Sequence, residues 1–290
     1  MPSAEVSSTQ RRRLRTLLRQ LRTEAALTQE QVAGEMDWSL SKVIRIETGA
    51  VSVSVNDVRA LLTLYSVTDR GRADRIIELA RVARQRPWWY PYREHYSSAF
   101  QSYLDLEAGA AVLKFFHPAM IPGLLQTEDY ARAATVATAF GQEADEQRVD
   151  LDVDVRQRRQ RAIFDQPTPP RIVVVLEEPA LRRPLGGAAT MRGQLRRLLE
   201  VQELPHAALH VLPFTADVVG GSFGQFIILE FEDEDDAPAV YLDGVAGADV
   251  LRSDIRFSEP YIRMYDRLYG AALDAPASTA FVRRLAAELD

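Results

Sequence analysis

Apolar side chains in the first 65 residues recur every three or four positions, which is the spacing of amphipathic helices. In the arginine-rich segment 11–26 they form a single stripe of leucines. Two shorter segments, 29–36 and 40–48, repeat the pattern, and each follows a residue that commonly caps a helix, Thr28 and Ser39. The pattern therefore predicts a long first helix and two short helices that are joined by a tight turn.

The second of these short helices has apolar residues on its expected inner side. Val43, Ile44 and Ile46 are predicted to pack inward, and Gly49 is expected to end the helix because glycine readily adopts the left-handed conformation. A further helix is predicted to begin with Asn56 as its cap. Several short helices in succession, two of them joined by a three-residue turn, form a helix-turn-helix arrangement.

A different pattern begins after the loop DQPTPP, where short apolar runs alternate with turns. Strands are predicted at 171–177, 207–213, 225–231 and 239–242, with a helix at 190–203 between the first two. This order favours a small mixed sheet. We therefore predict a mainly α N-terminal helix-turn-helix domain and a larger α+β C-terminal domain, whose small mixed sheet is backed by helices.

The predicted boundaries divide the chain into three parts. Residues 1–69 form the helix-turn-helix domain, and residues 95–290 form the α+β domain, to which we assign effector or partner binding and dimerisation. Residues 70–94 form a linker helix and an aromatic junction, and the helix must end at Pro87 because proline cannot continue it.

The composition excludes several classes of protein. The 290 residues include no cysteine, which excludes disulfides, thiol catalysis and thiolate metal sites. The longest apolar runs have the length of strands and are too short to span a bilayer. The charges near the N-terminus are not followed by an apolar core, so no secretory signal is expected. We therefore predict a cytoplasmic protein without a membrane segment.

The formal net charge of −6 has the wrong sign for a protein that binds phosphates, but the charge is unevenly distributed. The first 86 residues contain 15 Arg and Lys against 10 Asp and Glu, whereas the remaining 204 contain 20 against 31. Salt limits the repulsion from the acidic part to about a Debye length, ~8 Å at physiological ionic strength. A basic N-terminal domain can therefore bind nucleic acid in this chain.

The order of residues in the helix-turn-helix segment is specific. The pattern L-T-Q-x-x-V-A, which begins at Leu27, is followed by S-x-S-x-V-x-x-I-E-x-G, which ends at Gly49. In spacing and residue type it closely resembles the lambda-repressor and Cro-type (XRE) family of transcriptional regulators. That family more often has glycine at the turn, where this chain has Asp37. The resemblance implies a sequence-specific regulator that binds double-stranded DNA.

By this resemblance the second helix of the motif enters the major groove. The candidate DNA-binding residues are Gln29, Ser39, Leu40, Ser41, Lys42 and Arg45. Arg45 would read a guanine, because a guanidinium can donate two parallel hydrogen bonds to that base. Gln29 and Lys42 would contact phosphates, and Glu47 would pair with an arginine inside the domain. The alternative is an ordinary solvated helix face.

Aromatic residues gather in the stretch PWWYPYREHY at 87–96. They would either bind a ligand or plug the junction with the C-terminal domain. We group this stretch with the turn at 122–126, which begins with Pro122-Gly123, and with the glycine-containing loop at 220–223. Exposed aromatic side chains beside such a loop suit a ligand pocket or a groove for a partner protein. The candidate ligand or partner residues are Trp88, Trp89, Tyr92, Pro122, Gly123, Gln126, Gly221 and Phe223.

A basic run, RQRRQR at 156–161, lies in a helix that is predicted at about 143–164. It is either a second DNA-binding patch or a salt-linked surface. Asp152 and Asp154 stand four residues before Arg156 and Arg158, which is the spacing of ion pairs along a helix. We therefore favour the salt-linked surface.

The C-terminal part also resembles a known group. The segments IPGLLQTEDYARA, LEEPALRRPLGG, MRGQLRRLLE and GSFGQFIILEF occur in the order found in actinobacterial antitoxin-like (WhiJ-type) regulators. The resemblance implies a small cognate partner protein that is encoded nearby. Two functions remain open, namely a regulator that senses this protein or a small-molecule ligand, and an antitoxin-like protein that neutralises the partner and regulates its own expression.

No catalytic set of residues emerges from the sequence. His206 and His210 are four apart, but His210 falls in a predicted strand, where this spacing does not form a metal site with a third ligand. The glycine-rich segment 220–224 precedes a strand and lacks the lysine of phosphate-binding loops. We therefore expect no enzyme, no metal and no cofactor, and a DNA-tethered enzyme is the less favoured alternative.

A single module of this size contacts only a few base pairs, which rarely provides the specificity that a genome demands. We therefore predict a homodimer that binds an inverted-repeat operator. Dimerisation is expected mainly through residues after 69, with a contribution from Ile76, Ile77 and Leu79 of the linker helix.

Overall fold

The computed structural model describes residues 6–48, 51, 53–84, 86–139, 145–218, 224–232, 236–244 and 247–289. The chain forms two compact units. The N-terminal unit comprises residues 1–91 with 104–109, and the C-terminal unit comprises residues 92–103 with 110–290. Gly49, Gly221 and Phe223 lie outside the described residues.

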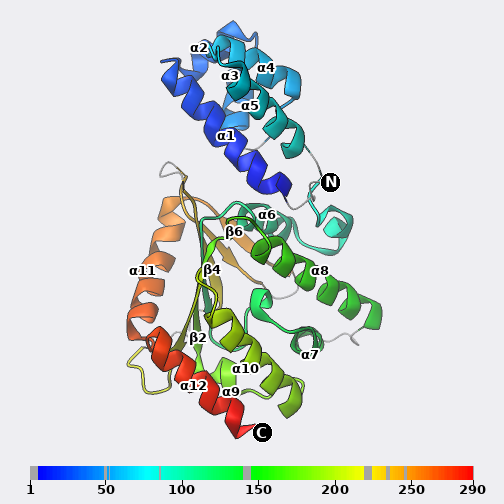
Figure 1. Cartoon of the computed structure of the whole chain (residues 1–290), viewed down its shortest axis with the longest axis vertical. Helices are drawn as coiled ribbons and strands as arrows, with labels where there is room; N and C mark the ends of the chain where they lie inside the picture. Colours follow the sequence, from blue (N-terminus) through cyan, green and yellow to red (C-terminus); the bar gives the residue numbers. More distant parts are fainter. Residues whose placement is uncertain are drawn as a thin grey trace. The chain divides into compact units, whose positions relative to one another are not determined.

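The N-terminal unit is built from helices (Figure 1). These are α1 (Val6–Glu24), α2 (Gln29–Glu35), α3 (Leu40–Glu47), α4 (Val55–Leu64) and α5 (Arg70–Ala83). Thr28 caps α2 in a capping box with Gln31, and Ser39 caps α3, as predicted. The prediction of Asn56 as the next cap is wrong, because the Ser54 hydroxyl accepts the Asp57 N–H at 3.0 Å and α4 begins at Val55.

All five helices contribute to one core in this unit. The leucine stripe of α1 is buried against apolar residues of α2, α3 and α4. Helix α5, which was predicted to be part of a linker, adds Ile76, Ala80 and Ala83 to the same core. It packs against α1 and α4. The part of its apolar face that contains Ile76, Ala80 and Ala83 is therefore covered within the N-terminal unit, whereas Ile77 and Leu79 are only partly buried.

The C-terminal unit contains a six-stranded mixed sheet with the order β3-β2-β1-β4-β5-β6. The strands are β1 (Val112–His117), β2 (Arg171–Glu177), β3 (Ala207–Leu212), β4 (Phe226–Glu230), β5 (Ala239–Leu242) and β6 (Val250–Arg252). The pairs β1–β2 and β2–β3 are parallel, and the other three pairs are antiparallel. The four predicted strands are present, and β1 and β6 complete the sheet.

Helices lie on both faces of this sheet (Figure 1). The remaining helical segments of the described chain are η1 (Tyr90–His95), α6 (Ser98–Glu107), η2 (Gly123–Leu125), α7 (Glu128–Thr138), α8 (Glu146–Phe164), α9 (Glu178–Arg182), α10 (Ala188–Gln202), α11 (Ile255–Ala271) and α12 (Ala275–Glu288). The predicted fold class, a helical helix-turn-helix domain followed by an α+β domain, is confirmed. No helix in the described part of the chain is long and apolar enough to cross a bilayer.

Side-chain alternation along the strands assigns residues to the two faces. Phe116, Phe226 and Val240 share a core with Tyr265 and Leu268 of α11. The intervening residues of β1, β4 and β5 therefore point to the opposite face, toward the side of α8. This second face contains the cavity described below.

Candidate nucleic-acid interface and candidate ligand cavity

The turn between α2 and α3 requires an unusual backbone conformation. Asp37 has a φ of 53°, in the left-handed region that aspartate and asparagine adopt more readily than most side chains. The Trp38 N–H then donates to the Ala33 carbonyl at 2.8 Å, which closes the end of α2. Asp37 therefore meets the backbone requirement at the position where the resembling family more often has glycine.

Helix α3 has one buried face and one exposed face. Val43, Ile46 and Glu47 are buried. The exposed positions are Leu40, Ser41, Ile44 and Arg45. The prediction that Ile44 packs inward is wrong, since 38% of its surface is exposed. Positions 40, 41, 44 and 45 lie on the same side of a helix, so Ile44 belongs to the surface that was predicted to face the bases.

The polar candidate residues on and beside α3 differ in the hydrogen bonds and ion pairs that their side chains make within the domain. The Arg45 guanidinium has no hydrogen-bond or ion-pair partner among the described residues, and it is exposed. The Ser39 hydroxyl accepts the Lys42 N–H at 3.2 Å and so serves as the helix cap. The Lys42 ammonium lies 3.5 Å from the centre of the Trp38 ring and 3.7 Å from Asp57 Oδ2. Arg45 is therefore the candidate with the greatest freedom to reach a base.

A buried carboxylate fixes α3 to α1 and α2. Glu47 Oε1 accepts from Arg22 Nε at 2.7 Å, and Glu47 Oε2 accepts from Arg22 Nη2 at 3.1 Å. The hydrogen bond and the charge of Glu47 raise the pKa of Arg22. The predicted pairing of Glu47 with an arginine inside the domain is thus confirmed. Gln29, predicted as a phosphate contact, donates from Nε2 to Glu47 Oε2 at 2.7 Å, so its amide is used to join the helices.

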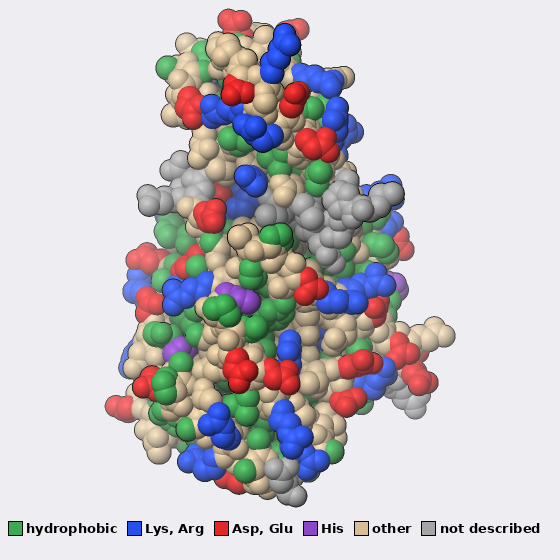
Figure 2. Space-filling view, viewed as in Figure 1, with side chains coloured by type: hydrophobic (Ala, Val, Ile, Leu, Met, Phe, Trp, Pro, Cys, Tyr) green, Lys and Arg blue, Asp and Glu red, His purple; other side chains and the backbone are tan. Residues whose placement is uncertain are grey.

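Side chains of both charges appear on the face of the N-terminal unit that is visible in Figure 2. The excess of Arg over Asp and Glu in the first 86 residues gives the unit its positive charge. This charge is compatible with the attraction to phosphates on which DNA binding depends.

The predicted aromatic patch is divided between the two units. Trp88 and Trp89 belong to the N-terminal unit, and Trp89 is buried with its Nε1 donating to Asp105 Oδ1 of the same unit at 3.3 Å. Tyr92 belongs to the C-terminal unit, where its hydroxyl donates to Asp154 Oδ2 at 2.8 Å. Within that unit, Tyr92 is not among the residues that line the cavity around Pro122.

A cavity of about 500 Å³ lies on the α8 side of the sheet. The strand register brings Phe115, Ile227 and Tyr241 side by side as neighbours on β1, β4 and β5, and all three line this cavity. Three of the predicted ligand residues, Pro122, Gly123 and Gln126, line it as well. The structure therefore brings these three together.

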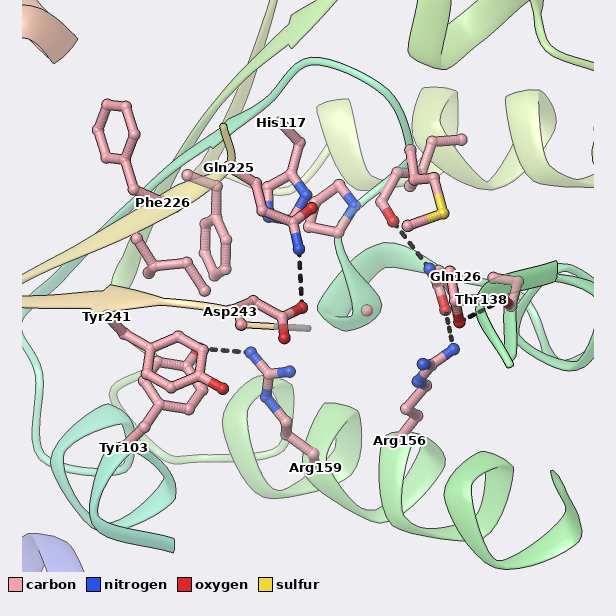
Figure 3. Close-up of a pocket in the computed structure, with 18 residues that line it drawn as sticks. Tyr103, His117, Gln126, Thr138, Arg156, Arg159, Gln225, Phe226, Tyr241 and Asp243 are labelled. Carbon is pink, nitrogen blue, oxygen red and sulfur yellow. Dashed lines mark hydrogen bonds between the residues drawn. The ribbon is translucent and has the colours of Figure 1, made fainter. Parts of the chain in front are cut away.

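Two arginines of α8 also line the cavity (Figure 3). Arg156 Nη1 donates to Gln126 Oε1 at 2.9 Å and to the Ala131 carbonyl at 3.1 Å. Arg159 donates to the Tyr103 hydroxyl, and its guanidinium lies 5.0 Å from the centre of the Tyr103 ring. The Tyr103 and Tyr241 rings are stacked with centroids 4.3 Å apart. Burial lowers the pKa of Arg156.

The basic run of α8 is therefore only in part the salt-linked surface that was predicted. Arg158 pairs with Asp154 at 3.0 Å on the exposed side of the helix, as its spacing indicated. Asp152 pairs with Arg148 at 3.3 Å and not with Arg156. Arg156 and Arg159 are three residues apart, so both lie on the inner side of α8, and Arg156 forms no ion pair with a described residue.

His117 and Asp243 complete the polar wall of the cavity (Figure 3). Only 8% of the surface of His117 is exposed, and neither ring nitrogen meets the geometry of a hydrogen bond to a described residue, although the side chain of Gln225 interacts with the ring. Burial, assisted by the Arg159 charge, lowers the pKa of His117 to about 3. Asp243 Oδ2 accepts from Gln225 Nε2 at 2.7 Å. Asp243 is exposed, but the protein atoms around its carboxyl group and then the charge of Asp249 raise the pKa of Asp243.

Sequence reasoning missed most of these cavity residues. The residues not predicted include Tyr103, His117, Arg156, Arg159, Gln225, Tyr241 and Asp243. Two local signals were available, namely the alternation of Phe115 with His117 in β1 and the three-residue spacing of Arg156 and Arg159 in α8. Neither signal shows that β1 and α8 face one another.

Comparison with known families agrees with the division of the chain. Residues 13–74 match the model of a helix-turn-helix domain, which indicates a DNA-binding regulator. Residues 100–284 match the model described as Domain of unknown function (DUF5753). No curated protein and no solved structure matches the chain. Because the second model covers well over half of the residues, the chain belongs to the DUF5753 family.

Proposed function

We propose that this protein is a sequence-specific transcription regulator of the lambda-repressor and Cro type, which reads DNA with the exposed face of α3. One observation carries the proposal. The inner face of α3 is fixed by Val43, Ile46 and the Arg22–Glu47 pair, whereas its outer face presents Arg45 without a partner among the described residues. A rigid helix with an available guanidinium suits the bidentate recognition of guanine.

The outer face also supports apolar base contacts. Leu40 and Ile44 are both exposed, and an apolar side chain in the major groove can contact the methyl group of thymine. Leu40, Ser41, Ile44 and Arg45 together form the proposed reading surface. Lys42 and Ser39 support this surface from its edge, since both are held by contacts within the motif.

Selection of preferred sites from random duplex DNA, followed by footprinting, tests this proposal on the full chain. We expect a defined sequence that contains a guanine whose replacement weakens binding by about 1–3 kcal/mol. Arg45→Ala should remove the preference at that base pair. Arg45→Lys is the matched control, because it retains the charge but not the paired donors, and should preserve non-specific affinity. Equal loss of specific and non-specific binding in Arg45→Ala would assign reading to another element.

We also propose that the protein acts as a homodimer on an inverted repeat. A single helix-turn-helix module reads too few base pairs for genomic specificity. A dimer provides the additional specificity by reading two half-sites that lie one helical turn, ~34 Å, apart. Because Ile76 of α5 is buried in the N-terminal core, the dimer contacts are assigned to the C-terminal unit. Light scattering at micromolar concentration should give twice the chain mass of 32.6 kDa. A monomer on a single half-site would contradict this.

The C-terminal unit is proposed to receive the regulatory signal, in the manner of the WhiJ-type regulators that it resembles. The signal is a small molecule or a small cognate protein, and the cavity beside α8 favours the small molecule. Purification of the natively expressed protein, with mass spectrometry of everything that accompanies it, distinguishes these sources. Recovery of a stoichiometric small protein that abolishes DNA binding would favour the antitoxin-like alternative.

We further propose that this unit binds its effector without transforming it. Besides the two tyrosines, the hydroxyl-bearing side chain in the described lining is Thr138, and it donates to the Ala134 carbonyl at 2.9 Å. It is therefore not activated by a base, as a nucleophile would be. Recovery of a bound compound in unchanged form after prolonged incubation is the expected result, and turnover would contradict it.

A further inference from the structure

We propose that the cavity between α8 and the sheet binds a small organic carboxylate, with its anionic group held by Arg156. This inference rests on the proposed effector role of the C-terminal unit and names the ligand class. The carboxylate would lie beside Gln126, and the remainder of the molecule would pack against the row formed by Phe115, Ile227 and Tyr241.

The charges of the lining favour an anion. The described lining contains the guanidinium groups of Arg156 and Arg159 and a single carboxylate, that of Asp243. Arg156 makes its hydrogen bonds to neutral oxygens of Gln126 and Ala131; the charges of Asp152 and Asp243 act on it, but no described carboxylate lies within 4.0 Å of it. A cation that is withdrawn from water is costly unless a counter-charge accompanies it. A ligand carboxylate would provide that counter-charge.

Unmet hydrogen-bonding capacity in the wall favours a ligand with a second polar group. His117 is more than nine-tenths buried and lines the cavity; the side chain of Gln225 interacts with the ring, but neither ring nitrogen meets the geometry of a hydrogen bond to a described residue. A neutral imidazole has one donor and one acceptor. A hydroxyl group on the ligand can satisfy either nitrogen, provided that the neighbouring side chains adjust to admit it. We therefore expect hydroxylated acids to bind more tightly than unsubstituted acids of the same size.

The size of the cavity and the charges of a neighbouring hollow limit the ligand further. About 500 Å³ is typical of sites for small organic molecules. A neighbouring hollow shares Arg156, Tyr241 and Asp243 with the cavity, and it also carries Asp145, Asp152 and Asp249. These carboxylates would repel molecules with several negative charges, such as oligonucleotides. A singly charged acid with an aromatic or branched body meets both conditions.

A thermal-shift and calorimetric test on the full chain uses matched pairs of probes. The acids are benzoate, 4-hydroxybenzoate, 4-hydroxyphenylacetate and 3-hydroxybutyrate, and each is compared with its own neutral primary amide. We expect saturable binding of at least one hydroxylated acid and at least tenfold weaker binding of its amide. Loss of a hydrogen bond to a charged group corresponds to about a ten- to hundredfold change in Kd. Arg156→Gln should therefore weaken the binding of the acid by about that factor.

Arg158→Gln is the matched control, because Arg158 belongs to the same helix but its side chain is exposed and pairs with Asp154. It should leave the Kd unchanged. Arg156→Lys, which retains the charge, provides a second variant if Arg156→Gln fails to fold, and should bind the acid with an intermediate Kd. Equal binding of acid and amide, unchanged binding in both Arg156 variants, or no binding by any acid in the panel would overturn the inference.

DNA binding is measured separately, on the same samples without acid. Failure of every acid to bind, together with normal selection of a DNA sequence, rejects the carboxylate site and leaves the proposed regulator intact. Failure to select any DNA sequence rejects the proposed function, irrespective of whether the acids bind.

Discussion

Arg22 and Glu47 form a two-point ion pair that joins α1 to the last turn of α3, with donor–acceptor distances of 2.7 and 3.1 Å. The Arg22 Nη1 atom also donates to the Leu27 carbonyl, just before α2. The pair therefore connects the helix proposed to read DNA with the scaffold that holds it. Because the Glu47 side chain is only 5% exposed, the loss of its partner would leave a charge in the interior.

Replacing Arg22 by methionine is expected to destabilise the N-terminal unit by about 3 kcal/mol, since breaking a buried pair leaves an uncompensated charge. All three tryptophans, Trp38, Trp88 and Trp89, lie in this unit, so tryptophan fluorescence during urea unfolding of the full chain reports on it. The exposed Arg72–Glu24 pair is the control, and Arg72→Met should cost less than about 1 kcal/mol. Similar losses for the two variants would contradict a structural role of the Arg22–Glu47 pair.

Two isoleucines of α3 should respond differently to the same substitution. Ile46 is 5% exposed and belongs to the core, so Ile46→Ala should cost about 2–4 kcal/mol of folding free energy. Ile44 is 38% exposed, so Ile44→Ala should cost less than about 1 kcal/mol. Ile44→Ala should instead lower the affinity for the selected DNA site. Urea unfolding and DNA titration of both variants test this, and a strongly destabilised Ile44→Ala would place that side chain in the core.

The same pair shows how far the sequence alone could predict the reading helix. The caps Thr28 and Ser39 and the burial of Val43 follow from local chemistry, and so does the pairing expected for Glu47. Local pattern could not separate Ile44 from Ile46, because a helix of two turns with apolar residues at 43, 44 and 46 allows more than one inner face. Packing of α3 against α1 and α2 decides between them, and α1 is distant in the sequence.

Distance along the chain also explains why the cavity was not predicted. Tyr103, Phe115, Arg156 and Tyr241 come from four elements. The antiparallel pairing of β1 with β4 and of β4 with β5 brings Phe115 and Tyr241 to one face of the sheet, and Tyr103 of α6 and Arg156 of α8 line the same cavity from outside the sheet. The sequence predicts the periodicity within each element, but it does not predict which strands pair or in which register. The basic run of α8 therefore indicated a surface, although Arg156 and Arg159 point inward. Strand β6 has only three residues, too few to show an alternating pattern.

A fragment that ends at residue 69 is expected to be unfolded, whereas a fragment that ends at residue 91 should fold. Truncation at 69 removes α5, whose Ile76 is 3% exposed and whose Ala80 is fully buried in the core. Deletion of a buried isoleucine side chain alone costs about 2–5 kcal/mol, which is a large part of the stability of a small domain. Circular dichroism of both fragments measures the effect. A cooperative thermal transition in the 1–69 fragment would show that α5 is dispensable.

The buried imidazole of His117 should make the C-terminal unit less stable as the pH falls below about 6.5. In the folded chain, burial holds the pKa of His117 at about 3, whereas an unfolded histidine has a pKa of about 6.5. Between these two values the unfolded state binds a proton that the folded state does not. The stability contributed by the neutral ring is therefore complete above pH 6.5 and is lost progressively toward pH 3, by at most about 1.4 kcal/mol per pH unit.

Between pH 7.5 and 6.0 the protonation of His117 should lower the free energy of unfolding by about 0.8 kcal/mol. His117→Gln should abolish this pH dependence, because glutamine does not titrate. Hydrogen exchange of peptides from β1 and β4, corrected for the intrinsic dependence of exchange on pH, measures the opening free energy of this unit in the full chain. His95→Gln is the control, since the His95 side chain is exposed. A pH dependence that is equal in the wild-type chain and in His117→Gln would show that the ring is protonated as readily when folded as when unfolded.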